Sequence, residues 1–155
     1  MGFYEVPFVP TPIPVVRRML QLAEVKEGEV VYDLGAGDGR ILFIAVREFK
    51  ARAVGVEIRR DLYRATKAKI EAEGLQNKIK LYNCSYYDID LSEADVVTLF
   101  LLTSANEKLR PKMERELKKG ARVVSHEFEV RGWIPKKVEK FYDGNSHHRI
   151  YLYTR

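Results

Sequence analysis

The residues with the clearest chemistry lie between Val30 and Gly39, where the sequence reads VVYDLGAGDG. Three glycines alternate with other residues after a β-branched apolar run, and an amphipathic pattern follows from Arg40. This order predicts a strand, a tight turn and a helix start, the setting in which a glycine-rich loop binds a nucleotide-like ligand. Asp33 and Asp38 place two carboxylates at the turn. The expected ligand therefore lies beside negative charge.

The charges of the turn decide between ligands of this kind. A dinucleotide would place its pyrophosphate at the helix N-terminus, where Asp33 and Asp38 would repel it. Position 40 is Arg, so the third glycine of a dinucleotide-binding G-x-G-x-x-G motif is also missing. S-adenosylmethionine carries a sulfonium and an α-ammonium group in place of phosphate. We therefore expect S-adenosylmethionine as cofactor and S-adenosylhomocysteine as its product.

A third acidic residue supports a nucleoside ligand. Glu57 ends a predicted strand at 53–57, eighteen positions after Gly39. An acidic side chain at the end of the second strand of such a unit hydrogen-bonds the ribose hydroxyls. A structural turn and an unrelated strand-end Glu would each explain one feature, but they explain both at this spacing poorly.

Composition is that of an ordinary globular protein. The chain has 155 residues, 46% of them hydrophobic and 32% charged, which suffices for one domain with its own core. We expect a single domain over 1–155, with an N-terminal segment and helix at 1–27 and a cofactor-binding core at 28–155. No apolar run approaches a membrane span and no signal-peptide pattern is present, so we expect no membrane partner and a cytoplasmic location.

Cysteine and histidine counts bear on disulfides and metals. The single cysteine, Cys84, excludes an internal disulfide, and the three histidines do not have the spacing of a zinc site. We therefore expect no metal. The formal net charge of +5 permits a nucleic-acid partner, but the basic residues occur as scattered pairs. Such pairs are more typical of solvated helix faces than of a nucleic-acid-binding stripe.

The remaining sequence predicts the elements that position these residues. Thr11 and Pro12 are placed to cap and begin a first helix. Strands are expected at 29–34, 52–57, 79–83, 95–101 and 121–128, with helices at 40–49 and 60–73 and another from a capping box at Ser104 to Gly120, restarting at Pro111. Two short alternating runs, 138–142 and 149–153, predict a hairpin. The expected fold is α/β, a doubly wound, mostly parallel seven-stranded sheet with an antiparallel C-terminal hairpin.

In open α/β sheets the ligand binds beyond the carboxyl ends of the strands, where the strand order reverses. The candidate cofactor-binding residues from the first four strands are therefore Asp33, Gly35, Ala36, Gly37, Asp38, Gly39, Glu57, Ile58, Ser85, Tyr86, Phe100 and Leu101. Leu102 and Thr103 follow the fourth strand and are candidates to lie beside the reacting methyl group. Thr103 and Ser104 have helix capping as their other possible role.

The fifth strand offers His126, Glu127 and Phe128. Side chains of adjacent strand residues point to opposite faces, so only one of His126 and Glu127 can face the cleft, and His126 is the candidate for catalysis. His147 and His148 lie in or beside the hairpin turn and are expected to be exposed. Methyl transfer from a sulfonium is a direct displacement, so alignment can supply most of the rate. Desolvation and the nearby positive charge would lower the pKa of an acceptor amine without a dedicated base.

Several of these segments together resemble a known family. Asp33 to Gly39, with Glu57, resembles the cofactor motifs of class I S-adenosylmethionine-dependent methyltransferases. Nearly the whole chain is similar to the small archaeal protein-lysine methyltransferases of broad specificity and to their mitochondrial relatives. The segments that carry this narrower likeness are Val6–Pro12, Phe100–Thr103, Val124–Phe128 and Gly132–Trp133.

This resemblance implies a Rossmann-like fold and, as partners, protein substrates with exposed lysines. It also implies that the N-terminal motif lies over the methionine end of the cofactor. Phe8 is then a candidate catalytic residue and Thr11 a candidate cofactor-binding residue. The family often has Tyr at position 8, and many methyltransferases have an acidic adenine contact at the position of Ser85, so these two contacts differ here.

Two other functions remain open from the sequence. One is an RNA methyltransferase, although Phe100–Thr103 replaces the Asn/Asp-Pro-Pro-aromatic segment that base-amino methyltransferases typically have. That difference counts against methylation of base amino groups, not against ribose methylation. The other is a cofactor-binding module that works with a partner chain.

Overall fold

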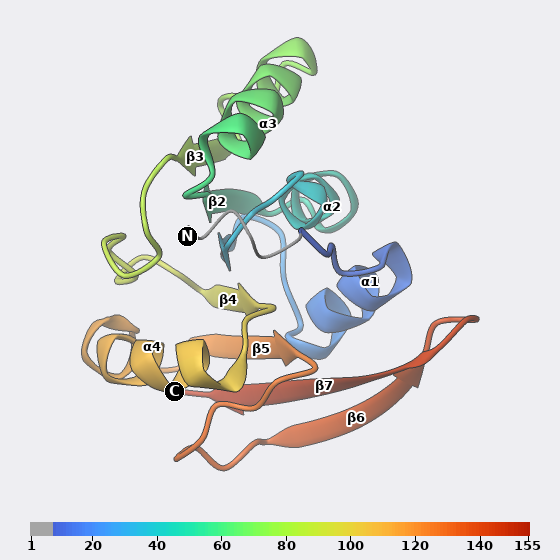
Figure 1. The fold of residues 1–155 in the computed structure, drawn as a ribbon, viewed down its shortest axis with the longest axis vertical. Helices are drawn as coiled ribbons and strands as arrows, with labels where there is room; N and C mark the ends of the chain where they lie inside the picture. Colours follow the sequence, from blue (N-terminus) through green and yellow to red (C-terminus); the bar gives the residue numbers. More distant parts are fainter. Residues whose placement is uncertain (1–7) are drawn as a thin grey trace.

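Seven strands form one twisted sheet in the computed structural model, which describes residues 8–155 (Figure 1). The strands are β1 (Val30–Leu34), β2 (Arg52–Val56), β3 (Ile79–Tyr82), β4 (Val96–Leu99), β5 (Arg122–His126), β6 (Lys137–Tyr142) and β7 (His147–Thr154). Their order across the sheet is β3-β2-β1-β4-β5-β7-β6. The first five are parallel, and β7 runs antiparallel between β5 and β6. The predicted doubly wound fold with an antiparallel hairpin is confirmed.

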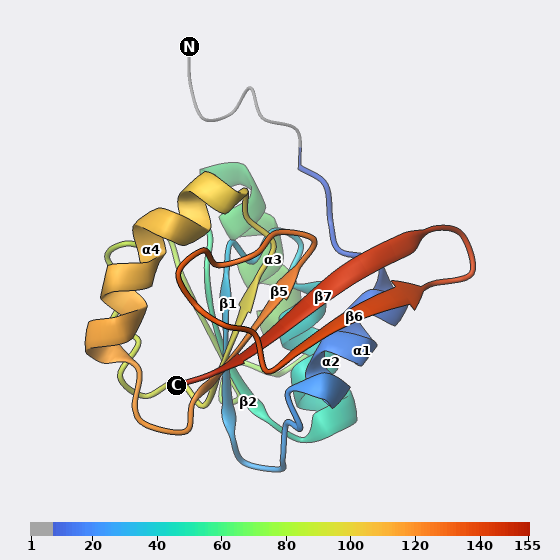
Figure 2. The same ribbon diagram turned by 90° about the horizontal axis from the view of Figure 1, so that it is seen from below.

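Within the described residues, four helices cover the two faces of this sheet. They are α1 (Ile13–Leu22), α2 (Arg40–Phe49), α3 (Arg60–Ala72) and α4 (Thr103–Glu116). The apolar faces of α1, α2 and α3 pack on one side, whereas α4 packs on the other (Figure 2). Side chains of β1 alternate between the two layers, with Val31 facing α1 and α2, and with Tyr32 and Leu34 facing α4. This near-continuous burial is typical of a central parallel strand covered by helices.

Three predicted helix features differ from the structure. Helix α1 has Pro12 as its N-cap and no side-chain cap, so the predicted capping role of Thr11 is wrong. The hydroxyl group of Thr11 instead lies 3.1 Å from Nδ1 of His126. Helix α4 likewise begins without a side-chain cap, which excludes the predicted capping box at Ser104. Pro111 lies inside α4 and does not restart it.

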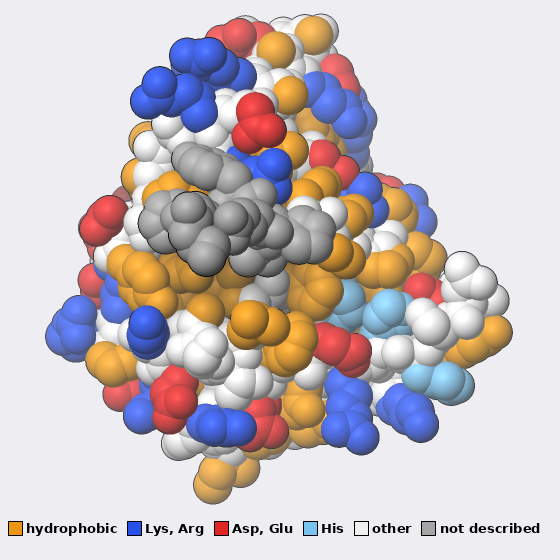
Figure 3. Space-filling view, in the orientation of Figure 1, with side chains coloured by type: hydrophobic (Ala, Val, Ile, Leu, Met, Phe, Trp, Pro, Cys, Tyr) orange, Lys and Arg blue, Asp and Glu red, His pale blue; other side chains and the backbone are white. Residues whose placement is uncertain are grey.

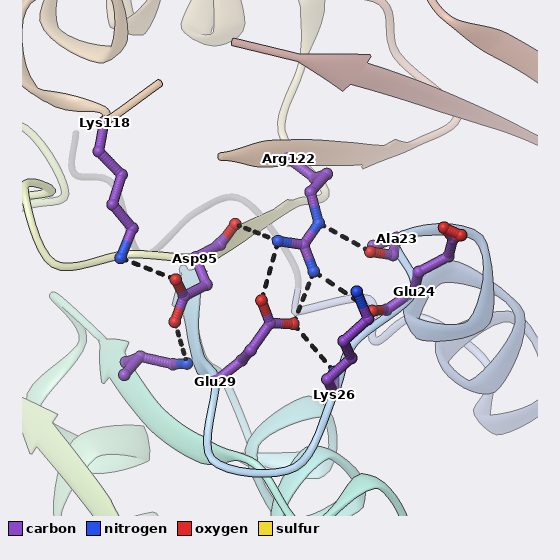
Figure 4. Close-up of polar contacts among 8 residues, drawn as sticks. Ala23, Glu24, Lys26, Glu29, Asp95, Lys118 and Arg122 are labelled. Atoms are coloured by element: carbon purple, nitrogen blue, oxygen red, sulfur yellow. Dashed lines mark hydrogen bonds and ion pairs between the residues drawn. The ribbon is translucent and has the colours of Figure 1, made fainter. Parts of the chain in front are cut away.

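A cluster of charged groups joins the amino ends of the strands (Figure 4). Arg122, which begins β5, pairs with Glu29 at 2.6 Å and donates to the carbonyl oxygen of Ala23 at 2.9 Å. Asp95, which precedes β4, pairs with Lys118 at 2.7 Å. These contacts hold the end of α1 and the starts of three strands together. None of the helices in the described part of the chain is long and apolar enough to span a membrane.

Candidate functional site

A cavity of about 450 Å³ lies at the carboxyl ends of β1, β2 and β4, within the size range of small-molecule sites. It lies where the strand order reverses between β1 and β4, the position predicted for the ligand. Among the described residues, those lining it are Phe8, Val9, Pro10, Thr11, Asp33, Gly35, Ala36, Asp38, Arg40, Ile41, Glu57, Ile58, Arg59, Leu62, Phe100, Leu101, Leu102 and Phe128.

Most of the predicted site residues are in this set. Six are not: Gly37, Gly39, Ser85, Tyr86, Thr103 and His126. Gly37 and Gly39 belong to the glycine turn and shape the cavity through the backbone. Ser85 accepts a hydrogen bond from the Tyr87 N–H at 3.1 Å, and Tyr86 packs on Tyr87, so both stabilise their own turn. The structure therefore gives no cavity position to the two residues that were expected beside adenine.

The sequence prediction missed Val9, Pro10, Arg40, Ile41, Arg59 and Leu62. Two signals in the sequence could have identified four of these residues. Arg59 and Leu62 follow soon after Glu57, and Val9 and Pro10 belong to the N-terminal motif. Val6 and Pro7 of that motif lie outside the described residues.

Glu57 fastens the glycine turn to the end of β2. Its Oε1 accepts a hydrogen bond from the Gly37 N–H at 2.8 Å, and its Oε2 accepts one from the Arg59 N–H at 2.9 Å. The residue is 6% exposed. Each carboxylate oxygen has a second lone pair, so Glu57 can hold this turn and still accept hydrogen bonds from ribose hydroxyls.

Gly37 is required by close packing as well as by its backbone conformation. Its φ of +58° is in the left-handed region, and a Cβ placed there would lie 2.3 Å from Cε1 of Phe8. On the other side, the Thr66 hydroxyl donates to the Gly37 carbonyl at 2.7 Å. The aromatic ring of the N-terminal segment thus occupies the space that a side chain at position 37 would need.

Asp33 is a buried carboxyl group on the wall of the cavity. Burial raises its pKa to about 7, the Thr98 hydroxyl at 2.8 Å opposes that rise, and the charges of Glu57 and Asp38 add to it. A cation in the cavity would favour the charged form of Asp33. This is the environment expected for a ligand that carries positive charge.

Asp38 is neutralised within the protein. Its Oδ2 lies 2.7 Å from Nη2 of Arg40, whose Nη1 also donates to the Thr11 carbonyl at 3.1 Å. Partial burial acts to raise the pKa of Asp38, but hydrogen bonds from Arg40 outweigh it and hold the pKa below its usual value. Among residues 8–155, the cavity wall carries three carboxylates and two guanidinium groups, the latter from Arg40 and Arg59. Its net charge is therefore negative when all five are ionised.

His126 lies behind the cavity wall and not on it. The residue is 2% exposed, and its ring packs against Phe100 with the ring centroids 4.2 Å apart. Its Nε2 lies 2.9 Å from Nδ1 of His148. Burial, and then the neighbouring His148, lowers the pKa of His126 to about 4, so the ring is neutral at neutral pH. The expectation that His148 is exposed is wrong, because its side chain is only 12% exposed.

The fold also brings together groups that the sequence spacing separates. One ligand atom from each of His126, Glu127 and His148 lies within 4.8 Å of the others. Two nitrogen atoms that bind one tetrahedral zinc ion lie about 3.3 Å apart. Nε2 of His126 and Nδ1 of His148 are closer to each other than this, at hydrogen-bonding distance. We therefore assign this contact as a hydrogen bond.

Comparison with known proteins identifies the family. The model of the ANTKMT methyltransferase domain matches residues 33–137. The chain belongs to this methyltransferase family. It is 54% identical to a protein-lysine N-methyltransferase of Saccharolobus islandicus, over 96% of this chain and 93% of that protein. It is 30% identical to the adenine nucleotide translocase lysine N-methyltransferase of Mus musculus, covering 96% of this chain but only 63% of the mouse protein.

A solved structure supports the cofactor assignment. It is described as an RNA methyltransferase from Salinibacter ruber in complex with S-adenosyl-L-homocysteine, and it superimposes on this methyltransferase with a TM-score of 0.88. The two are 42% identical, and the match covers 94% of this chain and 93% of that one. The chain is thus an S-adenosylmethionine-dependent methyltransferase, as the acidic glycine turn predicts. The buried Asp33 and the negative cavity wall fit this cofactor.

Proposed function

We propose that this methyltransferase transfers the methyl group of S-adenosylmethionine to lysine side chains of proteins, with little preference for the surrounding sequence. The observation that carries the proposal is the apolar rim of the cavity, formed by Phe8, Val9, Ile58 and Leu102. These side chains are 40–62% exposed although each also lines the cavity. On the face shown in Figure 3, apolar side chains gather below and to the right of its centre, and most Lys and Arg side chains lie nearer its outline.

A lysine side chain suits such an entrance. Its four-carbon stem can pack on apolar walls while the amine reaches inward and the backbone stays outside. The connections that border the cavity are short, namely 35–39, 57–59 and 100–102. Because these connections leave little room for contacts along a peptide, recognition of the acceptor rests mainly on its side chain. Broad specificity follows.

The walls also prepare the acceptor for reaction. The amine of lysine is protonated at neutral pH, and removal from water beside Phe100, Leu101 and Phe128 lowers its pKa. When bound, the cofactor supplies an electrophilic methyl group on a sulfonium. The protein aligns the amine for in-line displacement and excludes water, so proximity contributes most of the acceleration.

RNA is the second candidate substrate, since the Salinibacter structure is described as an RNA methyltransferase. RNA recognition needs phosphate-binding cations and aromatic platforms for bases. The rim of the cavity is mainly aliphatic, and Arg40 at its wall is already paired with Asp38. The geometry therefore favours a protein acceptor.

The experiment that tests the proposal is a competition between acceptors. The protein is incubated with methyl-labelled S-adenosylmethionine and with either mixed cellular protein or total RNA. As a control, a portion of each reaction is treated with protease or with ribonuclease to show which polymer carries the label. We expect label in many proteins, with mass spectrometry locating single-methyl mass increments on lysines in unrelated sequences. Label confined to RNA would overturn the proposal. Label in one motif of one protein would overturn broad specificity, and no label without an added partner would indicate a cofactor-binding module.

A further inference from the structure

A line of hydrogen bonds leads from the cavity wall to the turn between β6 and β7. Oγ1 of Thr11, a cavity residue, lies 3.1 Å from Nδ1 of His126. Nε2 of His126 lies 2.9 Å from Nδ1 of His148. Nε2 of His148 in turn lies 2.8 Å from Oδ2 of Asp143 and 3.1 Å from Oγ of Ser146. Five side chains from three parts of the sequence thus form one connected path.

The pairing of β5 with β7 creates this path. His126 ends β5 opposite Ile150 of β7, which brings His148 beside it from 22 positions along the chain. Thr11 closes the other end from the N-terminal segment. The ring of Phe100 covers His126 on the cavity side. Protons can therefore leave His126 along the path and not by direct contact with water.

The charge of Asp143 fixes the direction of every hydrogen bond. Hydrogen bonds from the N–H groups of Ser146 and Asn145 hold the pKa of Asp143 at about 2, so it is ionised and accepts a hydrogen bond from Nε2 of His148. A neutral His148 then has only a lone pair on Nδ1, which must accept from Nε2 of His126. The lone pair left on Nδ1 of His126 accepts from the Thr11 hydroxyl.

The consequence lies at the cavity end of the path. Because the hydrogen of the Thr11 hydroxyl points to His126, its oxygen has lone pairs for a donor in the cavity. The charged groups around His126 are Asp143, Glu127 and, when protonated, His148. The carboxylate of Glu127 is itself engaged by the Arg149 N–H at 3.0 Å. A proton that enters at Thr11 is thus drawn toward the ionised Asp143.

We propose that Thr11, His126 and His148 conduct the proton released by the acceptor amine from the cavity to solvent at the β6–β7 turn. This inference rests on the proposed function, since it needs an amine acceptor. The Thr11 oxygen takes a proton from the ammonium group and gives its own proton to Nδ1 of His126. His126 passes its Nε2 proton to Nδ1 of His148, which becomes a cation paired with Asp143 and then loses a proton to water.

The step is balanced in atoms and charge. The amine lone pair forms the new bond to the methyl carbon, and the carbon–sulfur bond breaks with its electron pair on sulfur. One proton leaves per methyl group transferred. The charge rests on His148 beside Asp143 and not on the buried His126. Once the product has left and water fills the cavity, His126 returns its Nδ1 proton through Thr11 to that water, His148 returns its Nδ1 proton to Nε2 of His126, and Nε2 of His148 takes a proton from solvent at the turn, which restores the starting direction.

The matched variants for a test are His148→Leu and His147→Leu. Both remove a histidine from the start of β7, but His147 packs on Tyr142 and does not belong to the path. We expect His148→Leu to lower kcat roughly tenfold to a hundredfold at pH 7, with cofactor Kd close to that of the parent and a lower melting temperature, because Nε2 of the buried His126 loses its acceptor. The deficit should shrink as the pH rises toward the pKa of the acceptor amine, where no proton needs removal. His147→Leu should retain the parent profile.

A second pair of variants tests the cavity end. Thr11→Val keeps the shape of the side chain but removes the hydroxyl, and it should reproduce the pH-dependent deficit of His148→Leu. Thr11→Ser restores the hydroxyl and should recover most of kcat. Combining Thr11→Val with His148→Leu should cost little more than either change alone, because both interrupt one path. Added imidazole should rescue His148→Ala at pH 7.

Three results would overturn the inference. One is a kcat for His148→Leu equal to the parent value from pH 6 to pH 9. Another is an equal loss at every pH, which would indicate a structural role. The third is activity lost on chelation and restored by zinc, which would show that the two histidines bind a metal. If neither protein nor RNA accepts methyl groups from the parent enzyme, the proposed function fails instead, and that assay precedes the variants.

Discussion

The protonation of Asp33 links cofactor affinity to pH. Its pKa of about 7 arises mainly from burial, so the carboxyl group loses its proton near neutral pH. A cationic cofactor binds the ionised form more tightly, so affinity should rise with pH through 7. We expect the affinity for S-adenosylmethionine, measured by calorimetry, to increase about tenfold from pH 6 to pH 8. The same shift destabilises the unliganded fold as pH rises from about 4 to 7, and bound cofactor offsets this loss.

The Thr98→Val variant provides the control for this prediction. It keeps the shape of a fully buried side chain but removes the hydroxyl that stabilises the charged form of Asp33. The pKa of Asp33 should rise further, which moves the affinity curve to higher pH. An affinity that does not change with pH in the parent protein, or a curve that Thr98→Val does not move, would contradict this account of Asp33.

At the residue scale, the sequence predicts acidic positions better than their pairing. Asp33 and Glu57 follow predicted strands, so their place at the cavity could be inferred from order alone. The pairing of Asp38 with Arg40 is local, but the sequence interpretation treated Arg40 only as a missing glycine. The contact between His126 and His148 depends on the register of β5 and β7, which no local pattern encodes.

Among the elements, the glycine turn and the N-terminal segment depend on each other. Gly37→Ala and Gly28→Ala both place a side chain at positive φ, +58° and +83°, and each should lose about 1 kcal/mol of unfolding free energy. At Gly37 the new Cβ meets the ring of Phe8, whereas at Gly28 no atom of the described residues lies within 4 Å of it. We expect only Gly37→Ala to weaken cofactor binding, by more than tenfold, in calorimetry. Equal affinity of the two variants would show that Phe8 does not shape the site.

Element boundaries reveal where sequence patterns stop being informative. The type of every helix and strand could be predicted, because alternation and amphipathic periods are local. Some ends could be predicted too, as the bounds of α2 were, but not those at which long-range contacts compete for the capping groups. The Thr11 hydroxyl bonds to a ring 115 positions away and leaves α1 uncapped. Pro111 stays inside α4, where it removes one backbone hydrogen bond but does not end the helix.

In the molecule as a whole, the carboxyl ends and the amino ends of the strands have different roles. The carboxyl ends carry the cavity, and the amino ends carry the charged cluster around Arg122. This division could be predicted in part, since a parallel sheet must place every ligand-facing loop at one edge. The cluster itself could not, because Glu29 and Arg122 are 93 positions apart and meet only through the strand order.

The charged cluster around Arg122 leads to a prediction about stability. Arg122 is about one-fifth exposed, bonds both oxygens of Glu29 and donates to backbone carbonyls at the end of α1. Arg122→Met leaves that carboxylate partly buried and unpaired, which should cost about 3 kcal/mol and lower the melting temperature by about 10 °C. Arg17→Met breaks the exposed pair with Glu48 and should leave the melting temperature close to the parent value, because water screens exposed ion pairs.

A measurement of cofactor affinity distinguishes a loss of stability at the amino ends of the strands from a change in the cofactor site. Neither Arg122 nor Arg17 lines the cavity, so we expect both variants to bind S-adenosylmethionine with the parent Kd below their melting temperatures. Thermal unfolding and calorimetry on the same samples check both quantities. If Arg122→Met weakened cofactor binding as much as it destabilises the fold, the strands would be transmitting strain from their amino ends to the glycine turn. The separation of the stabilising cluster from the site would then be wrong.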